Sequence, residues 1–505
     1  MSKEKNLKTC NSLIAPPGAG KSQWLIKHIS QHRNEHSVLA FPTLLLSEEI
    51  TKRLEELGIR FNIINSDTIE GATVTQVLEE ALCNQNDNII ICTHTALLLI
   101  RPDLLCGWKL YVDEVPSIWN CASPSFQDIQ FQKVFDNSII TLEPVEGKKH
   151  KLMKARQDKL ALIETLSKGG EGTAYSDTAT SVLEKLLDPS YVVEVDKLDK
   201  NINRTVRIIG VHDYLSAFEA ADEVTILCAE LHKSLLGVSL KGKGWNVSII
   251  DYDLGFTGYG NRVVIKPFLS GRSYSKSAAL ENTCKPQTEF TESCNIDKWL
   301  KKVFEDIGYH QALMTSHKWL QVELPLDSKG GSNILPIKID NRGINDYSGY
   351  TYAICLQHGN ISPVDVRSLS TLAQLLSGEN LVTEQDIKNA VQYERLYEST
   401  LQTVCRTALR DRSNQNPITL YVQDEAVAQF LAEKLGNAII DSNLSMNPLR
   451  VETEAKSKRN ESKAEALRMY SKGVAIKAIA HAIGKNERTV RDWLKPYRQL
   501  EQRAA

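Results

Sequence analysis

The stretch Leu13-Ile-Ala-Pro-Pro-Gly-Ala-Gly-Lys-Ser22 decides how the chain begins to fold. Two apolar residues lead into a Pro- and Gly-rich loop, and an amphipathic run over residues 23–29 follows directly. This order predicts a strand, a tight loop and a helix. Gly18 and Gly20 allow backbone N–H groups to come close to a phosphate, at the positive end of the new helix dipole. We therefore predict a phosphate-binding loop over residues 15–22.

The loop has the residues that a nucleotide site needs. We expect Lys21 to reach the β- and γ-phosphates of a nucleotide and the Ser22 hydroxyl to be a ligand of Mg²⁺. Ala15 stands where the pattern usually has glycine, and the alternative is a chance Gly-rich turn. The strand before the loop and the helix after it favour the nucleotide site. The expected nucleotide contacts are Ala15, Pro16, Pro17, Gly18, Ala19, Gly20, Lys21 and Ser22.

The composition is that of an ordinary globular protein. At 505 residues, with 42% hydrophobic and 24% charged residues, the chain has room for several domains. It has no apolar run of the roughly 20 residues that a membrane-spanning helix requires, and no secretory signal at its start. We therefore expect a cytoplasmic protein, nucleoid-associated if bacterial, with no membrane partner.

The ten cysteines are spread along the chain with no Cys-x-x-Cys pair, which argues against a zinc site and a disulfide framework. An iron–sulfur cluster of Cys83, Cys92, Cys106 and Cys121 is disfavoured because their spacing is wide and even.

The distribution of charge along the chain indicates a possible partner. From Val451 onward there are 13 Lys/Arg against 7 Asp/Glu, so the tail is basic while the rest is acidic, which suggests nucleic-acid contact by the tail.

Short apolar runs over residues 37–43, 88–97 and 110–116 alternate with helical patterns. This alternation predicts a parallel sheet covered on both faces, and ligands gather at the carboxyl ends of such strands. Asp113 and Glu114 fall at one of these ends. We expect Asp113 to hold Mg²⁺ and Glu114 to orient or deprotonate an attacking water, although paired acids can also form a solvated turn.

The strand–helix rhythm fails from about residue 120 to 220, where we expect a mostly helical insertion. Its basic stretch 148–156 reads as a helix, either a nucleic-acid grip or a solvated face. A second α/β set follows. The expected domains are lobe 1 at 1–240 with the insertion, lobe 2 at 241–440, a linker at 441–462, and a helical domain at 463–505.

The order of these features resembles that of the superfamily 2 helicases and translocases. The phosphate loop and the Asp113-Glu114 pair look like motifs I and II of that family. Other matches, in chain order, are Phe41-Pro-Thr43, Thr93-His-Thr95, Cys228-Ala-Glu230, Thr315-Ser316, Asn341-Arg-Gly-Ile-Asn345, and Gln402 with Arg406 and Arg410. The resemblance implies two RecA-like P-loop lobes that close on ATP and Mg²⁺.

The resemblance also implies roles for individual residues. Arg406 and Arg410 would act as arginine fingers on the γ-phosphate, while Gln402 and Gly343 would lie at the nucleotide. Thr43, Thr93 and Thr95 would contact the phosphates of one nucleic-acid strand. The chain departs from the family at Val115-Pro116 and at Cys228-Ala-Glu230, which lacks the usual hydroxyls. An extra residue between the arginines leaves either Arg410 or Arg412 as the second finger.

The tail has a second resemblance. Residues 463–470, 474–483 and 486–494 read as three helices, and Ala480, Gly484 and Val490 occupy the positions that a helix-turn-helix requires. This part resembles the resolvase/invertase type of DNA-binding module. The resemblance places Trp493 in the core and directs Lys485, Arg488, Thr489 and Arg491 toward duplex DNA. The alternative is a small helical interaction domain.

Taken together, the sequence predicts an ATP-dependent DNA helicase or translocase that moves along a single strand and is targeted by its tail. Two alternatives remain open. One is a DNA-stimulated P-loop ATPase that acts as a switch in plasmid or phage replication or in defence, without unwinding DNA. The other is a DNA-binding regulator that only senses nucleotide.

Overall fold

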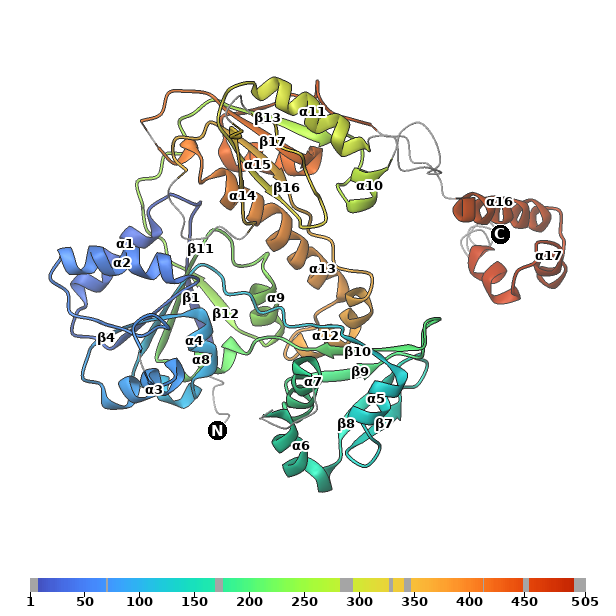
Figure 1. Cartoon of the computed structure of the whole chain (residues 1–505), viewed down its shortest axis with the longest axis horizontal. Helices are drawn as coiled ribbons and strands as arrows, with labels where there is room; N and C mark the ends of the chain where they lie inside the picture. The colour runs from blue at the N-terminus through green and yellow to red at the C-terminus, as the bar shows by residue number, and fades with distance from the viewer. Residues whose placement is uncertain are drawn as a thin grey trace, which may run out of the picture. The chain divides into compact units, whose positions relative to one another are not determined.

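The structure is a computed structural model that describes residues 8–69, 71–168, 176–281, 294–326, 330–339, 347–411, 413–447 and 454–494. The chain divides into two units (Figure 1). The main unit is Met1–Ser275 with Trp299–Met446, and the second is Lys276–Lys298 with Asn447–Ala505. No helix among the described residues is both long and apolar enough to cross a membrane.

Lobe 1 of the main unit is built on a parallel seven-stranded sheet in the order β12-β1-β11-β5-β2-β4-β3. Its strands are β1 (Thr9–Ile14), β2 (Ser37–Phe41), β3 (Asn62–Ile63), β4 (Ile89–Thr93), β5 (Lys109–Asp113), β11 (Glu223–Cys228) and β12 (Asn246–Ile249). Its helices are α1 (Lys21–Gln31), α2 (Leu44–Glu56), α3 (Val74–Asn84), α4 (His94–Leu99), α8 (Tyr214–Ala220) and α9 (Leu235–Gly242). Val38 and Ala40 face one core, and Leu39 and Phe41 face another. The sheet is therefore buried on both faces, as predicted.

Lobe 1 extends past the boundary expected at residue 240. Strand β12 lies in its sheet, and two later helices, α12 (Leu369–Leu376) and α13 (Glu384–Gln392), contribute Leu372 and Ile387 to its core. The expected range of lobe 2, 241–440, therefore contains segments that pack with lobe 1. The amphipathic pattern of these helices predicts a buried face without indicating which core it joins.

The insertion contains a five-stranded antiparallel sheet in the order β6-β10-β9-β8-β7, which the expectation of a mostly helical insertion missed. Its elements are β6 (Ser125–Gln127), α5 (Asp128–Val134), β7 (Ile140–Pro144), β8 (Lys151–Ala155), α6 (Leu160–Ser167), α7 (Asp177–Leu187), β9 (Val192–Val195) and β10 (Asn203–Ile209). The helix predicted over 148–156 is wrong. Met153 points into the core of the insertion while Lys151 and Lys154 are exposed, and these lysines obscured a strand pattern.

Lobe 2 is built on a parallel six-stranded sheet in the order β15-β14-β16-β17-β13-β18. Its strands are β13 (Val263–Leu269), β14 (Ala312–Ser316), β15 (Ile334–Ile337), β16 (Tyr352–Leu356), β17 (Ile418–Asp424) and β18 (Ala438–Ile440). Helices α11 (Asn295–Ile307), α14 (Ser399–Val404) and α15 (Glu425–Leu435) accompany it. The predicted α/β class, with two parallel sheets, is confirmed. A π-helical turn (Tyr393–Glu398) joins α13 directly to α14.

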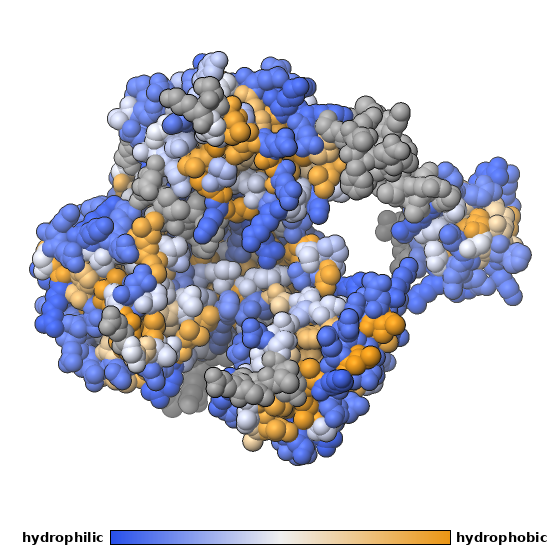
Figure 2. All heavy atoms as spheres, in the orientation of Figure 1, coloured by the Kyte–Doolittle hydropathy of each residue, from blue (hydrophilic) through white to orange (hydrophobic). Residues whose placement is uncertain are grey.

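The second unit contains α10 (Lys276–Leu280), α16 (Glu454–Ser471), α17 (Ile476–Ala482) and a further helical stretch over 487–494. Ala466, Ile479, Val490, Trp493 and Leu494 are buried together, so the prediction that Trp493 belongs to the core is confirmed. The linker expected over 441–462 is shorter, because α16 already begins at Glu454. Hydrophilic residues cover most of the visible face of this three-helix part (Figure 2).

Candidate nucleotide-binding site

The predicted phosphate loop joins β1 to α1. The Ala15 N–H donates to the Cys228 carbonyl on the neighbouring strand at 2.9 Å, which fixes the start of the loop. The chain then turns through Gly18 (φ 75°) and Gly20 (φ 101°), and α1 begins at Lys21. These positive φ values lie in the left-handed region that glycine adopts without strain. The strand–loop–helix prediction is confirmed.

Lys21 folds back over this loop. Its Nζ donates to the carbonyl oxygens of Ala15 at 2.7 Å and Pro16 at 3.1 Å. Burial lowers the pKa of Lys21, and the nearby carboxyl groups of Asp113 and Glu114 oppose that shift. The ammonium group is therefore held at the mouth of the loop, beside both acids that the sequence predicted.

Asp113 is the last residue of β5 and is only 3% exposed. Burial and the neighbouring Glu114 raise its pKa to about 7, while Lys21 and a hydrogen bond with the Ser22 side chain oppose the rise. Ser22 and Asp113, the two predicted metal ligands, therefore lie side by side. A hydroxyl and a carboxylate are oxygen ligands that suit Mg²⁺, which takes its other ligands from phosphates and water.

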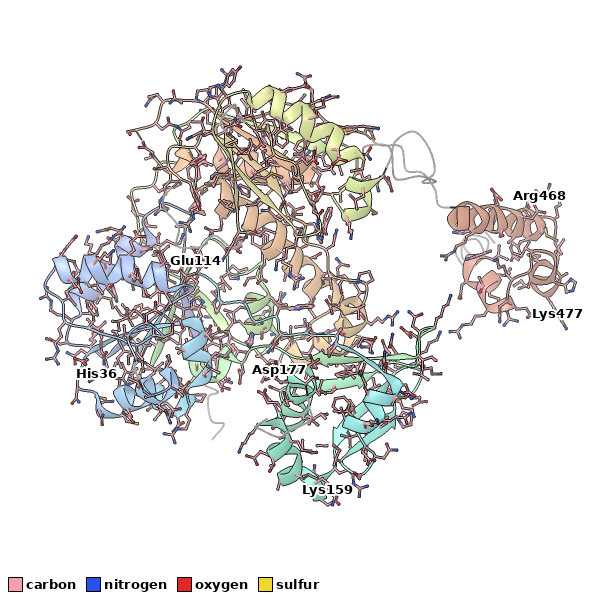
Figure 3. All side chains as sticks on the ribbon, viewed as in Figure 1. His36, Glu114, Lys159, Asp177, Arg468 and Lys477 are labelled. Carbon is pink, nitrogen blue, oxygen red and sulfur yellow. The ribbon has the colours of Figure 1, made fainter. Side chains whose placement is uncertain are left out.

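Glu114 turns away from the end of β5 with φ 62°, a left-handed conformation that is costly for a residue with a side chain. Its N–H donates to the Leu227 carbonyl at 2.7 Å, which holds this geometry in place. Backbone strain of this kind gathers at functional sites. Figure 3 marks Glu114 at the end of lobe 1 that meets lobe 2.

Lobe 2 provides the opposite wall of the same cavity, whose volume is about 210 Å³. Gln402 comes from α14, Arg406 follows that helix, and Arg410 ends a short 3₁₀-helix (Ala408–Arg410). Arg410 lies against the phosphate loop, with its Cγ 3.9 Å from the position that a Cβ on Gly18 would take. The predicted residues that line this one cavity are Pro17, Gly18, Gly20, Lys21, Ser22, Asp113, Glu114, Gln402, Arg406 and Arg410.

Sequence reasoning missed two residues of α2 in this cavity, Glu49 and Arg53, which form an ion pair. Burial and the adjacent Arg406 lower the pKa of Arg410, and Glu49 opposes the shift. The sequence of α2 is an ordinary amphipathic pattern, so only the fold indicates that its polar face reaches the site.

Tyr259 was also missed. It precedes β13, in the segment that connects the two lobes, and is 8% exposed. Its hydroxyl donates to the Pro17 carbonyl at 2.7 Å and accepts a hydrogen bond from the Cys405 Sγ at 3.2 Å. The phenol therefore connects the phosphate loop to the segment that carries Arg406. The only sequence signal was an aromatic residue within a Gly-rich segment.

The predicted strand-contacting threonines lie after β2 and β4, at the carboxyl edge of the sheet. The Thr43 and Thr93 hydroxyls cap α2 and α4, accepting from the N–H groups of Leu46 at 3.3 Å and Ala96 at 3.2 Å, and Thr95 is exposed. Gly343, the rest of Asn341–Asn345, and Arg412 lie outside the described residues.

In the second unit, the residues predicted to face DNA lie on and before the helical stretch 487–494. Lys485, Arg488 and Arg491 are exposed, and Thr489 is half-buried. Arg491 forms an ion pair with Glu487 at 3.3 Å.

No protein-family model matches the sequence, and no curated protein gives a significant match. Among solved structures, the chain is similar to S. tokodaii Xpd4 (12% identity, TM-score 0.49, covering 86% of this chain and 96% of that chain). It is also similar to S. cerevisiae Dbp5 bound to RNA and ADP BeF3 (10% identity, TM-score 0.32, covering 88% of this chain and 87% of that chain). A third similar structure is the DUF1998 helicase MrfA bound to DNA and AMPPNP (9% identity, TM-score 0.33, covering 86% of this chain and 50% of that chain). Because these similarities are low, the function of this chain must be inferred from its own site.

Proposed function

We propose that this chain is an ATP-dependent motor that hydrolyses ATP between two RecA-like lobes in order to move along or unwind DNA. The observation that carries the proposal is the shared cavity. Lys21, Asp113 and Glu114 of lobe 1 face Arg406 and Arg410 of lobe 2 across about 210 Å³. This volume is below the roughly 300–1,000 Å³ of typical small-molecule sites. It suits the phosphate end of a nucleotide.

The residues of lobe 1 fit a bound nucleotide with its metal. When a nucleotide binds, the Lys21 ammonium group would give up its hydrogen bonds to the Ala15 and Pro16 carbonyls. It would instead pair with phosphate oxygens. Ser22 and Asp113 would hold Mg²⁺, which favours the ionised form of Asp113. Bound ATP would supply the γ-phosphoryl group, and Mg²⁺ would neutralise charge on the phosphate oxygens.

Glu114 is the proposed general base. It follows Asp113 directly, lines the cavity and has a left-handed backbone conformation, and its carboxylate would orient a water. Arg406 and Arg410 are the proposed arginine fingers, which stabilise charge on the transferring phosphoryl group and contribute about 10³–10⁵ in rate. Because they belong to lobe 2, hydrolysis would depend on the approach of the lobes.

The second unit is the proposed targeting module. Its basic charge, its three-helix core and its exposed Lys485, Arg488 and Arg491 support binding of a helix-turn-helix to duplex DNA. Thr43, Thr93 and Thr95 are the proposed contacts of lobe 1 to a single strand, at the carboxyl edge of the sheet where ligands gather.

Steady-state ATP hydrolysis with and without single-stranded DNA tests the proposal. We expect DNA to stimulate the wild-type rate and Lys21→Ala to abolish hydrolysis at every DNA concentration. Lys27→Ala, an exposed lysine on the same helix α1, is the matched control and should retain the wild-type rate. Full activity of Lys21→Ala would contradict the proposed site. A separate assay of strand displacement, on duplexes with 5′ or 3′ single-stranded tails, distinguishes unwinding from DNA-stimulated hydrolysis without unwinding.

A further inference from the structure

A second cavity, of about 340 Å³, lies beside the nucleotide site. Its walls come from both lobes, at the carboxyl ends of β5, β14 and β16 and along the helical segment that leads into α14. Its volume falls within the range of sites that receive small molecules. The residues that line it on the lobe 2 side include His317, His358 and Arg395, and Trp119 lines the lobe 1 side.

The two cavities share residues. Glu114 and Gln402 line both of them. Glu398, which lines the second cavity, is close enough to Lys21 to raise its pKa against the effect of burial. An occupant of the second cavity that contacts Glu114 would therefore contact the proposed general base of the nucleotide site. This shared wall gives an occupant a direct physical route to influence hydrolysis.

Flat side chains line both sides of the second cavity. The His317 and His358 rings lie 4.2 Å apart between centroids, with Trp319 stacked near both, and the Arg395 guanidinium lies 5.0 Å from the centroid of the Trp119 ring. The backbone N–H of His358 donates to Nε2 of His317 at 2.9 Å, so that nitrogen carries no proton. Burial and the neighbouring His317 lower the pKa of His358 to about 4. At neutral pH these imidazoles are therefore uncharged stacking surfaces rather than cations.

The charge of the described lining residues disfavours a phosphate group. Among them are three carboxyl groups, those of Glu114, Glu394 and Glu398, and one guanidinium, that of Arg395. Glu394 already accepts the N–H of Leu235 at 2.7 Å. Carboxylates repel a phosphate but accept hydrogen bonds from N–H donors, as Glu and Asp do from the exocyclic amine of cytosine. The occupant should therefore be flat, apolar on its faces and rich in N–H donors at its edge.

We propose that this cavity receives one unstacked base of a single nucleic-acid strand and favours bases that carry an exocyclic amine. The inference rests on the proposed motor function and deepens it. Stacking on His358 and on the Arg395 guanidinium, which lies over the Trp119 ring, would hold the base, and its amine edge would face the carboxylates. Through Glu114 and Gln402, an occupied cavity would signal to the nucleotide site that a strand is present.

Binding of a single-stranded oligonucleotide with one 2-aminopurine tests the site without requiring hydrolysis, since the fluorescence of this base falls when it stacks. We expect wild-type protein to quench it. His358→Ala should lose the quenching and bind about tenfold more weakly, as expected for the loss of one base stack. Arg395→Met, which removes the guanidinium that lies over the Trp119 ring, provides a second variant. His310→Ala is the matched control, because His310 stacks on Tyr352 but lies outside the cavity.

The outcomes separate this inference from the proposed function. Absence of quenching by the wild type, or equal quenching by wild type and both cavity variants, would overturn the base site even if DNA stimulates hydrolysis. Quenching that the variants lose would support the site even if no ATP is hydrolysed, an outcome that contradicts the motor. Oligo(dC) should also bind more tightly than oligo(dT) of equal length. Equal affinity would overturn the proposed preference for amines.

Discussion

The hydroxyl of Tyr259 donates a 2.7 Å hydrogen bond to the carbonyl oxygen of Pro17, in the middle of the phosphate loop. Tyr259 belongs to the segment between the lobes, and its oxygen also accepts from Cys405, one residue before Arg406. Two consecutive hydrogen bonds through Tyr259 therefore link the phosphate loop to Cys405, the residue before the proposed arginine finger. We infer that this link positions the finger relative to the loop.

Tyr259→Phe should remove both hydrogen bonds of the hydroxyl while the aromatic ring still fills its place in the core. Leaving a buried carbonyl and thiol without the hydroxyl is expected to cost about 1–3 kcal/mol of stability and to weaken nucleotide binding several-fold. Urea unfolding and binding of a fluorescent nucleotide are the measurements. Tyr309→Phe is the control, because the side chain of Tyr309 is fully exposed. Identical nucleotide affinity of wild type and Tyr259→Phe would contradict a positioning role.

Asp113→Asn should change how stability depends on pH. The folded-state pKa of Asp113 is raised to about 7 from 3.8, so between these values the native state holds a proton that the unfolded state lacks. Stability therefore falls as pH rises through this window, and the penalty is complete above about pH 7. Asparagine removes the ionisation. We expect the stability advantage of the variant over wild type to grow by about 1–3 kcal/mol from pH 5 to pH 8.

Urea unfolding without nucleotide at the two pH values checks this prediction. Asp103→Asn, at an exposed aspartate, is the control and should show no such change. If the difference in unfolding free energy between Asp113→Asn and wild type is the same at both pH values, the buried carboxyl group does not titrate in this range.

Removal of residues 452–505 should reduce affinity for duplex DNA and leave DNA-stimulated ATP hydrolysis on single strands intact. The reason is that the residues of the nucleotide cavity all lie in the main unit, while Lys485, Arg488 and Arg491 lie in the second. Fluorescence anisotropy with a labelled duplex and a steady-state ATPase assay are the measurements. Unchanged duplex affinity would indicate that the tail is a protein-interaction module.

Short local signals explain what the sequence predicted well. The phosphate loop, the Asp113-Glu114 pair and the Gln402–Arg410 segment each place their chemistry within a few residues, and the structure brings all three to one cavity. Their roles in catalysis stay predictions. Strands β2, β4 and β5 were also predicted, because buried parallel strands are short, nearly continuous apolar runs.

The features that the sequence did not predict depend on packing between distant segments. Tyr259 meets Pro17 across 242 positions of the chain. Helices α12 and α13 carry a normal amphipathic pattern, which does not reveal that they join the core of lobe 1. In the insertion, exposed Lys151 and Lys154 hid the strand alternation around Met153. The second cavity exists only where the ends of strands from two lobes meet.

We propose that lobe 2 completes the catalytic site through Arg406. The most direct test compares nucleotide binding and turnover in Arg406→Ala, with Arg101→Ala, at an exposed arginine of lobe 1, as the control. We predict that Arg406→Ala binds a non-hydrolysable ATP analogue within a few-fold of wild type while its hydrolysis rate falls by about 10³ or more. Hydrolysis by Arg406→Ala at the wild-type rate would show that lobe 2 does not complete the catalytic site through Arg406.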